Sequence, residues 1–261
     1  MSRPATSYPR RAEDHPWFET AGPIGLAHRG GALHPANAGR ENTLAAFRMA
    51  AGMGLGYLET DVKLTADGHL VCFHDDTLDR CTDATGRVGA RTLEQLREVR
   101  VEGAEPIPTL LEALEALPDA CFTVDLKDRA AIAPMARLLQ RRDLAERVCV
   151  AGASDGALGL LAEQTPGLRT ALGWRSLTAL ISASKARTFL PGRVATGQFA
   201  HVPIQLGAVS ALLQLQLGHG FLGLAAVAHH QEEAKHGGPQ SGDERNLKGC
   251  GRAGNQHDDA G

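Results

Sequence analysis

Short apolar runs alternate with amphipathic segments through much of this chain. The runs predict strands because they are short and rich in β-branched and aromatic residues, and the longer segments predict helices because their apolar residues recur at helical spacing. The predicted strands are residues 24–27, 57–62, 62–64, 70–73, 121–127, 147–151 and 168–172, and the predicted helices are a segment from Thr43 and residues 110–117, 130–142 and 154–164. This alternation is typical of parallel strands covered by helices.

Local signals mark two helix starts and one turn. Thr92-x-x-Gln95 and Thr109-x-x-Glu112 are capping boxes, which satisfy free amides at the start of a helix. Residues 65–68 predict a tight turn between two extended segments. About six strand–helix units precede a change of pattern, against the eight of a complete barrel. We therefore predict an α/β fold, a β/α (TIM) barrel that is incomplete or irregular at its C-terminus, with a site on the C-terminal face of the sheet.

The pattern divides the chain into a polar leader (residues 1–20), a barrel domain (21–200) and a divergent segment (201–261). No Asp, Glu, Lys or Arg occurs in residues 194–231. Within them, the uncharged stretch 206–228 approaches the ~20 residues of a membrane span, but its Gln, His and Gly content argues against one. We expect no membrane association. From about residue 229 the composition is too polar to bury a core, which predicts a disordered tail.

Composition excludes several classes of function. The 261 residues include 27 basic and 30 acidic side chains, with a net charge of −3 and no long basic stretch, so we expect no nucleic-acid partner. The five cysteines are scattered and odd in number, which favours reduced thiols. Residues 1–20 lack the apolar core of a secretory signal, which predicts a cytoplasmic location. The sequence leaves the oligomeric state open.

Candidate chemistry lies at the ends of the predicted strands. A strand places residues i and i+2 on one face, so Glu59-x-Asp61 and Asp125-x-Lys127 can each direct two polar groups at one spot. Glu59 and Asp61 are flanked by apolar residues, and buried carboxylates need a cation or donors. The alternatives are a solvated edge strand for the first pair and a simple ion pair for the second. We favour a site that binds a cation.

Several motifs in order resemble the glycerophosphodiester phosphodiesterase family. They are His28-Arg29-Gly30, Glu41-Asn42-Thr43, Glu59-x-Asp61, His74-Asp75, Thr77-Leu78-x-Arg80-x-Thr82 with Gly86, Ile107-Pro108-Thr109-Leu110-x-Glu112 and Asp125-Leu126-Lys127. Each motif alone is weak, but their order and spacing together are specific, and the resemblance covers roughly residues 24–174.

The resemblance implies a β/α barrel that hydrolyses glycerophosphodiesters to an alcohol and glycerol 3-phosphate with one divalent cation, Mg²⁺ or Ca²⁺. It implies His28 and His74 as the acid–base pair, Glu59, Asp61 and Asp125 as metal ligands, and Arg29 and Lys127 as phosphate-binding residues. The family more often has Glu in the place of Asp125. These residue types suit the chemistry, because oxygen ligands favour a hard cation and imidazole titrates near neutral pH.

Two more residues are candidates for substrate binding. Glu41 is expected to orient a catalytic side chain or to bind the glycerol, although Glu41-Asn42-Thr43 equally predicts a helix cap with Asn42 or Thr43 at the N-cap. Trp174 follows a predicted strand and is a candidate for the wall of the alcohol pocket. The sequence does not decide which histidine is the acid and which the base.

The resemblance ends before the C-terminus. After Gln198 nothing is similar to the family's last two motifs, a Trp-Thr-x-Asn/Asp motif and an Asp-Gly-Ile-x-Thr-Asp-x-Pro-like motif, and our hypothesis is a shifted reading frame or a replaced C-terminus. Two alternatives to the hydrolase therefore stay open. One is an inactive barrel-derived protein that binds a phosphorylated ligand or a partner, and the other is a phospholipase-like lyase that forms a cyclic phosphate.

Overall fold

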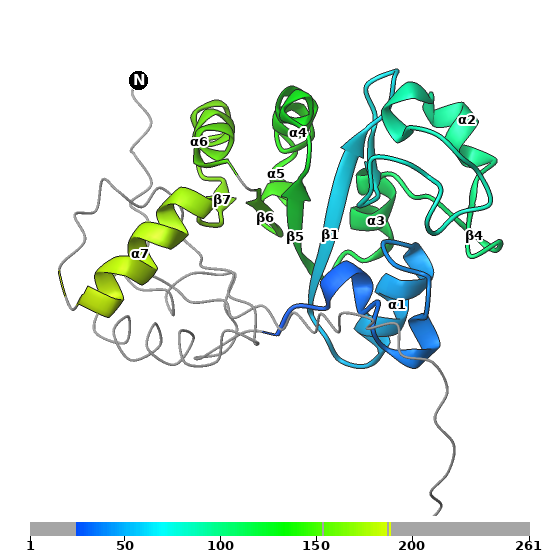
Figure 1. Cartoon of the computed structure of the whole chain (residues 1–261), viewed down its shortest axis with the longest axis horizontal. Coiled ribbons are helices and arrows are strands. Elements are labelled where there is room, and N and C mark those ends of the chain that lie inside the picture. Colours follow the sequence, from blue (N-terminus) through cyan, green and yellow to red (C-terminus); the bar gives the residue numbers. More distant parts are fainter. Residues whose placement is uncertain (1–24, 153, 187, 189–261) are drawn as a thin grey trace, which may run out of the picture. The chain divides into compact units, whose positions relative to one another are not determined.

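The computed structural model describes residues 25–152, 154–186 and 188, and its centre is a five-stranded sheet (Figure 1). The strand order is β2-β1-β5-β6-β7, in which β2 is antiparallel to β1 and the other neighbours are parallel. The strands are β1 (Tyr57–Leu64), β2 (Leu70–Cys72), β5 (Cys121–Leu126), β6 (Val148–Ala151) and β7 (Arg169–Thr170). A separate two-stranded sheet pairs β3 (Arg100–Val101) with β4 (Glu105–Pro106).

Helices follow the parallel strands, as the alternating pattern predicts. In chain order the α-helices are α1 (Leu44–Gly52), α2 (Leu93–Arg97), α3 (Leu110–Ala116), α4 (Ile132–Leu138), α5 (Arg142–Ala145), α6 (Asp155–Gln164) and α7 (Trp174–Ala186). Short 3₁₀ helices are η2 (His28–Gly30), η3 (Pro35–Asn37), η4 (Val88–Ala90) and η5 (Arg129–Ala131). The strand–helix order and the parallel strands are those expected of an incomplete β/α barrel.

The predicted local signals are confirmed. Thr92 and Thr109 both form complete capping boxes, with Gln95 and Glu112 as the reciprocal partners. Thr43 caps α1 by accepting a hydrogen bond from the Ala46 amide. Residues 65–68 connect β1 to β2, which pair with Leu64 opposite Leu70. These short-range hydrogen bonds form where the sequence predicts them, because each partner lies within a few residues.

Two predicted elements differ in the structure. The strand predicted at residues 24–27 is represented among the described residues by a single bridge from Ala27 to Leu58, because the chain then turns into η2. The helix predicted at residues 130–142 is broken into η5, α4 and α5. Arg141 has an extended backbone before α5, and its guanidinium binds Glu115 of α3, so a tertiary ion pair is present where the helix breaks. The described sheet also falls short of six strand–helix units.

The main apolar core lies between one face of the sheet and its helices. Leu58 and Val62 of β1 and Phe122 of β5 are fully buried in it, together with Phe47 of α1. The rings of Phe47 and Phe122 meet edge to face with centroids 5.5 Å apart. Because side chains alternate along a strand, the neighbouring residues Glu59 and Asp61 point to the opposite face. A packed apolar face therefore positions a polar one.

A smaller core supports the segment between β2 and α3. It contains the fully buried Val71, Leu78, Val88 and Leu96. Leu78 and Cys81, which are both buried, anchor the turn that carries Arg80. This segment is therefore packed against β2 rather than free in solvent.

Some predictions fall outside the described residues: the leader (1–20), the divergent segment (201–261), its uncharged stretch and the disordered tail. Within the described part, no helix is both long and apolar enough to cross a bilayer. The four cysteines described, Cys72, Cys81, Cys121 and Cys149, are free thiols, in agreement with the expectation from their spacing.

Candidate active site

Glu59 and Asp61 lie on the same face of β1, two residues apart, and both are buried. β1 lies between β2 and β5, so the alternative of a solvated edge strand is wrong. Asp61 is the direct register partner of Asp125 on the parallel neighbour β5. The three carboxylates predicted as metal ligands therefore come from one face of two adjacent strands, with Asp125 near the C-terminal end of β5.

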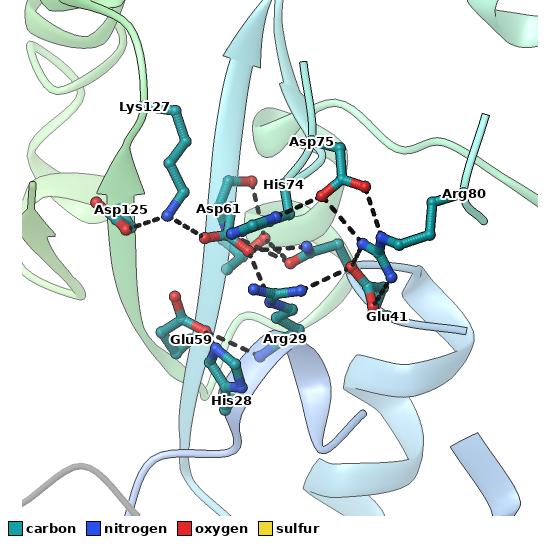
Figure 2. Close-up of polar contacts among 12 residues, drawn as sticks. His28, Arg29, Glu41, Glu59, Asp61, His74, Asp75, Arg80, Asp125 and Lys127 are labelled. Carbon is teal, nitrogen blue, oxygen red and sulfur yellow. Dashed lines mark hydrogen bonds and ion pairs between the residues drawn. The ribbon is translucent and has the colours of Figure 1, made fainter. Parts of the chain in front are cut away.

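Lys127 lies between two of these carboxylates. Its Nζ is 2.6 Å from Asp125 Oδ2 and 2.9 Å from Asp61 Oδ1 (Figure 2). Burial lowers the pKa of Lys127, but the charges of Asp125 and Asp61 outweigh it and raise that pKa above its ordinary value. The ion pair considered for Asp125 and Lys127 is therefore present. The ammonium group of Lys127 lies between the carboxylates of Asp61 and Asp125.

The charges of Glu59 and Asp61 are balanced differently. Burial raises the pKa of Asp61, but Lys127 and Arg29 outweigh it and leave that pKa below its ordinary value. Burial raises the pKa of Glu59 as well, and the negative charge of Asp61 raises it further, with a smaller contribution from Asp125. The Arg29 amide donates to Glu59 Oε2 at 2.9 Å, yet the pKa of Glu59 stays well above its ordinary value. The site therefore has more negative charge than its own donors balance.

His28 and Arg29 lie in η2, the turn that follows the Ala27 bridge. His28 Nε2 is 3.8 Å from Glu59 Oε2. Arg29 has a left-handed backbone, with a φ of 50°, which directs its amide to Glu59. Gly30 completes the turn with a φ of 76°, and an added Cβ there would lie 2.8 Å from the Phe47 ring. Glycine at this position lets the turn pack directly on α1.

The Arg29 side chain joins two acidic residues. Its Nη1 donates to Glu41 Oε1 at 3.0 Å, and its Nε lies 3.2 Å from Asp61 Oδ2. The second contact is an ion pair without hydrogen-bond geometry, and the buried Nε has no hydrogen-bond acceptor among the described residues. A buried N–H donor without an acceptor is costly, so this atom is suited to an anionic oxygen from a ligand.

His74 follows β2 and is held by its neighbour. Its Nδ1 lies 2.6 Å from Asp75 Oδ1. Arg80 in turn contacts both Asp75 and Glu41, so that the predicted residues His74, Glu41 and Arg29 belong to one chain of polar contacts (Figure 2). Glu41 is therefore placed where it can orient another side chain, which was one of the two roles expected for it.

Asn42 is a site residue that the sequence pattern did not single out. It is buried, and its Nδ2 donates to Asp61 Oδ2 at 3.1 Å while its Oδ1 accepts from the Thr60 hydroxyl at 2.8 Å. Its φ of 59° is left-handed, and Thr43 rather than Asn42 is the cap of α1. The signal available was its place in the motif Glu41-Asn42-Thr43, which the sequence analysis related to a helix cap rather than to the site.

Asp75 and Arg80 were also missing from the predicted site residues, although both lie in motifs that the sequence showed. A carboxylate next to a histidine is a usable signal, but Arg80 reaches Glu41 across 39 positions of sequence. Trp174 is the first residue of α7, and its side chain falls outside what the structure describes. Among the described residues, no three His, Cys, Asp or Glu side chains converge in a ready metal site.

The fold and this geometry together define a class of protein: a β/α barrel that gathers buried carboxylates, histidines and basic side chains at the C-terminal ends of its parallel strands. Residues 28–165 match the Glycerophosphoryl diester phosphodiesterase family, and the chain belongs to that family. The match begins at His28 and includes each candidate residue of the site except Trp174.

Individual relatives agree with this assignment. The chain is 32% identical over 161 residues to the glycerophosphodiester phosphodiesterase of Caldanaerobacter subterraneus subsp. tengcongensis, covering 56% of this chain and 65% of that one. It is 46% identical over 116 residues to glycerophosphodiester phosphodiesterase 1 of Bos taurus, covering 40% and 34%. A phosphodiesterase from Oleispira antarctica, solved in complex with the product sn-glycerol-3-phosphate, is 25% identical with a TM-score of 0.59, covering 78% and 92%. The chain spans less than two thirds of the length of either of the first two relatives.

Proposed function

We propose that this chain hydrolyses glycerophosphodiesters to an alcohol and glycerol 3-phosphate, with one divalent cation and with His28 and His74 as the acid–base pair. The observation that carries the proposal is the group of three carboxylates on adjacent strands, buried at Glu59 and Asp61 and half-buried at Asp125, beside two histidines and two basic side chains. A buried charge of this kind is expensive unless it binds a cation, and binding sites are where such a cost is offset.

The donor set fits a hard cation. Glu59, Asp61 and Asp125 supply only oxygen atoms, which suit Mg²⁺ or Ca²⁺. The Lys127 ammonium between Asp61 and Asp125 is a stand-in that marks this position as favourable for positive charge. When bound, a divalent cation at these carboxylates would neutralise phosphate oxygens as charge develops on them. Activity measured separately with Mg²⁺ and with Ca²⁺ distinguishes the two metals.

Arg29 and Lys127 are proposed to hold the phosphate. The Arg29 Nε forms an ion pair with Asp61 but has no hydrogen-bond acceptor among the described residues, so a phosphate oxygen there would supply the hydrogen bond that this buried donor lacks. Lys127 lies on the other side of Asp61. Two cations that flank one carboxylate can bind a phosphodiester between them, because the ester carries one negative charge. Glu41 keeps the guanidinium of Arg29 in place.

The two histidines lie on different segments that meet at this cluster. His28 is beside Glu59, and His74 is beside Asp75. Imidazole can accept a proton from the attacking oxygen or donate one to the departing alkoxide, and each such transfer contributes about 10²- to 10⁴-fold in rate. We propose that the two histidines divide these transfers between them. Trp174 remains a proposed wall of the alcohol pocket.

The test is release of glycerol phosphate from glycerophosphocholine by the purified chain, with Mg²⁺ or Ca²⁺ and then with excess EDTA. The His28→Ala variant is expected to lose turnover, and His69→Ala is the matched control because His69 is exposed and pairs with Asp67 outside the site. The hydrolase is supported if EDTA abolishes turnover, His28→Ala lacks turnover and His69→Ala retains it. A cyclic phosphate as the final product would indicate the lyase instead.

Absence of turnover from folded protein that still binds glycerol phosphate would favour the inactive, phosphate-binding alternative. Isothermal titration with glycerol 3-phosphate distinguishes this result from simple misfolding. A cytoplasmic location stays a prediction.

A further inference from the structure

Arg80 is the centre of the polar contacts that surround His74 and Arg29, and no role has been assigned to it above. Its Nε is 2.5 Å from Asp75 Oδ2, and its Nη2 is 3.2 Å from Asp75 Oδ1. On its other side, Nη1 is 2.9 Å from Glu41 Oε2, and Nη2 is 2.5 Å from Glu41 Oε1 (Figure 2). One guanidinium therefore makes two paired contacts, each with both oxygens of a carboxylate.

The contact with Asp75 determines which nitrogen of His74 carries a proton. Burial raises the pKa of Asp75, but hydrogen bonds from Arg80 and His74 outweigh it and hold that pKa at about 2. Asp75 is ionised at neutral pH, as a carboxyl with an ordinary pKa also is, and can only accept a hydrogen bond; Arg80 acts by contacting both Asp75 oxygens, which keeps Oδ1 directed at His74. Because His74 Nδ1 lies 2.6 Å from Asp75 Oδ1, the proton of a neutral His74 must be on Nδ1. Its Nε2 is then the nitrogen that can accept a proton.

The contact with Glu41 acts on the other side of the site. Glu41 Oε1 accepts from both Arg80 Nη2 and Arg29 Nη1. Burial raises the pKa of Glu41, but Arg80 and Arg29 outweigh it and keep that pKa below its ordinary value. Glu41 is thus an ionised bridge between two guanidinium groups. A shift of Arg80 would move the bridge and, through it, Arg29.

We propose that Arg80 is a positioning residue that fixes the Nδ1–H tautomer of His74 through Asp75 and the orientation of Arg29 through Glu41. Its effect on catalysis rests on the proposed function, whereas its effect on the His74 tautomer does not. Arg80 is poorly suited to bind the phosphate itself, because contacts to two carboxylates use four of its five N–H donors and balance its charge. Lysine cannot replace it, because an ammonium lacks the planar fork that contacts both carboxylates in pairs.

The first experiment measures the tautomer without requiring activity. Long-range ¹⁵N–¹H correlation spectra of the ¹⁵N-histidine-labelled, metal-free chain assign the protonated nitrogen of His74. The wild-type chain is expected to show the Nδ1–H form, and Arg80→Ala is expected to shift His74 towards a mixture of tautomers. Arg97→Ala is the matched control, because Arg97 has the same 49% side-chain exposure and pairs with Glu112 outside the site. An unchanged His74 signal in Arg80→Ala, with folding verified by thermal unfolding, would overturn the proposal.

The second experiment separates positioning from direct binding. With glycerophosphocholine, Arg80→Ala is expected to lower kcat by about 10- to 100-fold, as for other groups that orient site residues, with a smaller rise in KM because the displaced Arg29 is proposed to hold the phosphate. Arg80→Lys is expected to restore little, and added methylguanidine is expected to restore part of the activity of Arg80→Ala. A raised KM with unchanged kcat would show that Arg80 binds substrate and would overturn the proposal. If the wild-type chain has no turnover, the proposed function fails, but the tautomer measurement still decides the role of Arg80.

Discussion

Asp61 and Asp125 face each other in register on adjacent parallel strands, with the Lys127 ammonium between their carboxylates. Two negative charges on adjacent strands repel each other unless a cation lies between them. In the described structure the cation belongs to the chain itself. A metal ion that binds here must therefore compete with Lys127 for the same oxygen atoms, and this competition makes Asp125 the most informative position to change.

Asp125→Asn is predicted to weaken Mg²⁺ or Ca²⁺ binding by at least about tenfold, because it removes a charged oxygen ligand from the donor set. Asp125→Glu is predicted to retain binding, since the longer side chain keeps the carboxylate and is the residue more common in the family. Isothermal titration with each metal measures the affinities. Asp143→Asn is the control, because Asp143 pairs with Arg141 on the exposed surface. Equal metal affinity in Asp125→Asn and the wild-type chain would exclude Asp125 as a ligand.

Glu59→Gln is predicted to stabilise the metal-free protein while it removes metal binding. Burial and the adjacent charge of Asp61 raise the pKa of Glu59, so its ionised form is costly at neutral pH and a neutral amide relieves that cost. A gain of about 1 kcal/mol would raise the Tm by about 2–4 °C in a chain of this size. Thermal unfolding with and without Mg²⁺ or Ca²⁺ measures both effects. A lower Tm of Glu59→Gln in EDTA would contradict this prediction.

Asp75→Asn is predicted to destabilise the protein in a pH-dependent manner. The pKa of Asp75 is about 2 in the folded protein, below its ordinary value, because hydrogen bonds from Arg80 and His74 outweigh the effect of burial. A lowered pKa means that the ionised carboxylate stabilises the fold above about pH 4 and that this stabilisation is lost as the pH falls towards 2. After allowance for solvent screening, we expect about 1 kcal/mol at pH 7.

Urea unfolding of the wild-type chain and of Asp75→Asn at pH 7, 5 and 3, in EDTA, measures this difference. It should be similar at pH 7 and 5 and smaller at pH 3. Asp119→Asn is the control, since Asp119 is exposed in the turn before β5. A difference between wild type and Asp75→Asn that grows as the pH falls would show that the sign is wrong.

Asn42 is predicted to contribute to stability through both its side chain and its backbone. Asn42→Gly removes the hydrogen bonds to Asp61 and Thr60, which we expect to cost about 1–3 kcal/mol, because buried partners lose their hydrogen bonds. Asn42→Ala should cost about 1 kcal/mol more than Asn42→Gly, since alanine is strained at a φ of 59°. Denaturant unfolding measures both variants. If alanine is tolerated better than glycine, the left-handed backbone does not contribute to the cost.

Both variants should also be assayed for metal binding, since Asn42 Nδ2 contacts a carboxylate proposed as a ligand. A stability loss without any change in metal affinity would limit the role of Asn42 to the fold. A parallel loss of affinity would indicate that Asn42 keeps Asp61 in the orientation that a cation requires.

Residue order alone specifies the local elements and the face on which the carboxylates lie. The capping boxes of α2 and α3, the turn at residues 65–68 and the spacing of Glu59 and Asp61 depend on neighbours within a few residues, and each is found as predicted. The order of motifs was also sufficient to predict the family. These features are readable because short-range hydrogen bonds and side-chain alternation follow directly from residue order.

The pairing of charges at distant positions follows from how the strands and helices pack, not from residue order. Arg80 reaches Glu41 across 39 positions, and Asn42 reaches Asp61 across 19. The Lys127 ammonium also contacts Asp61 on the neighbouring strand. No local pattern specifies these three contacts. The helix break before α5 also coincides with a contact between distant residues, because Arg141 binds Glu115 on another helix. Electrostatic partners depend on distance in space and on burial, and both are set only when the strands pack side by side.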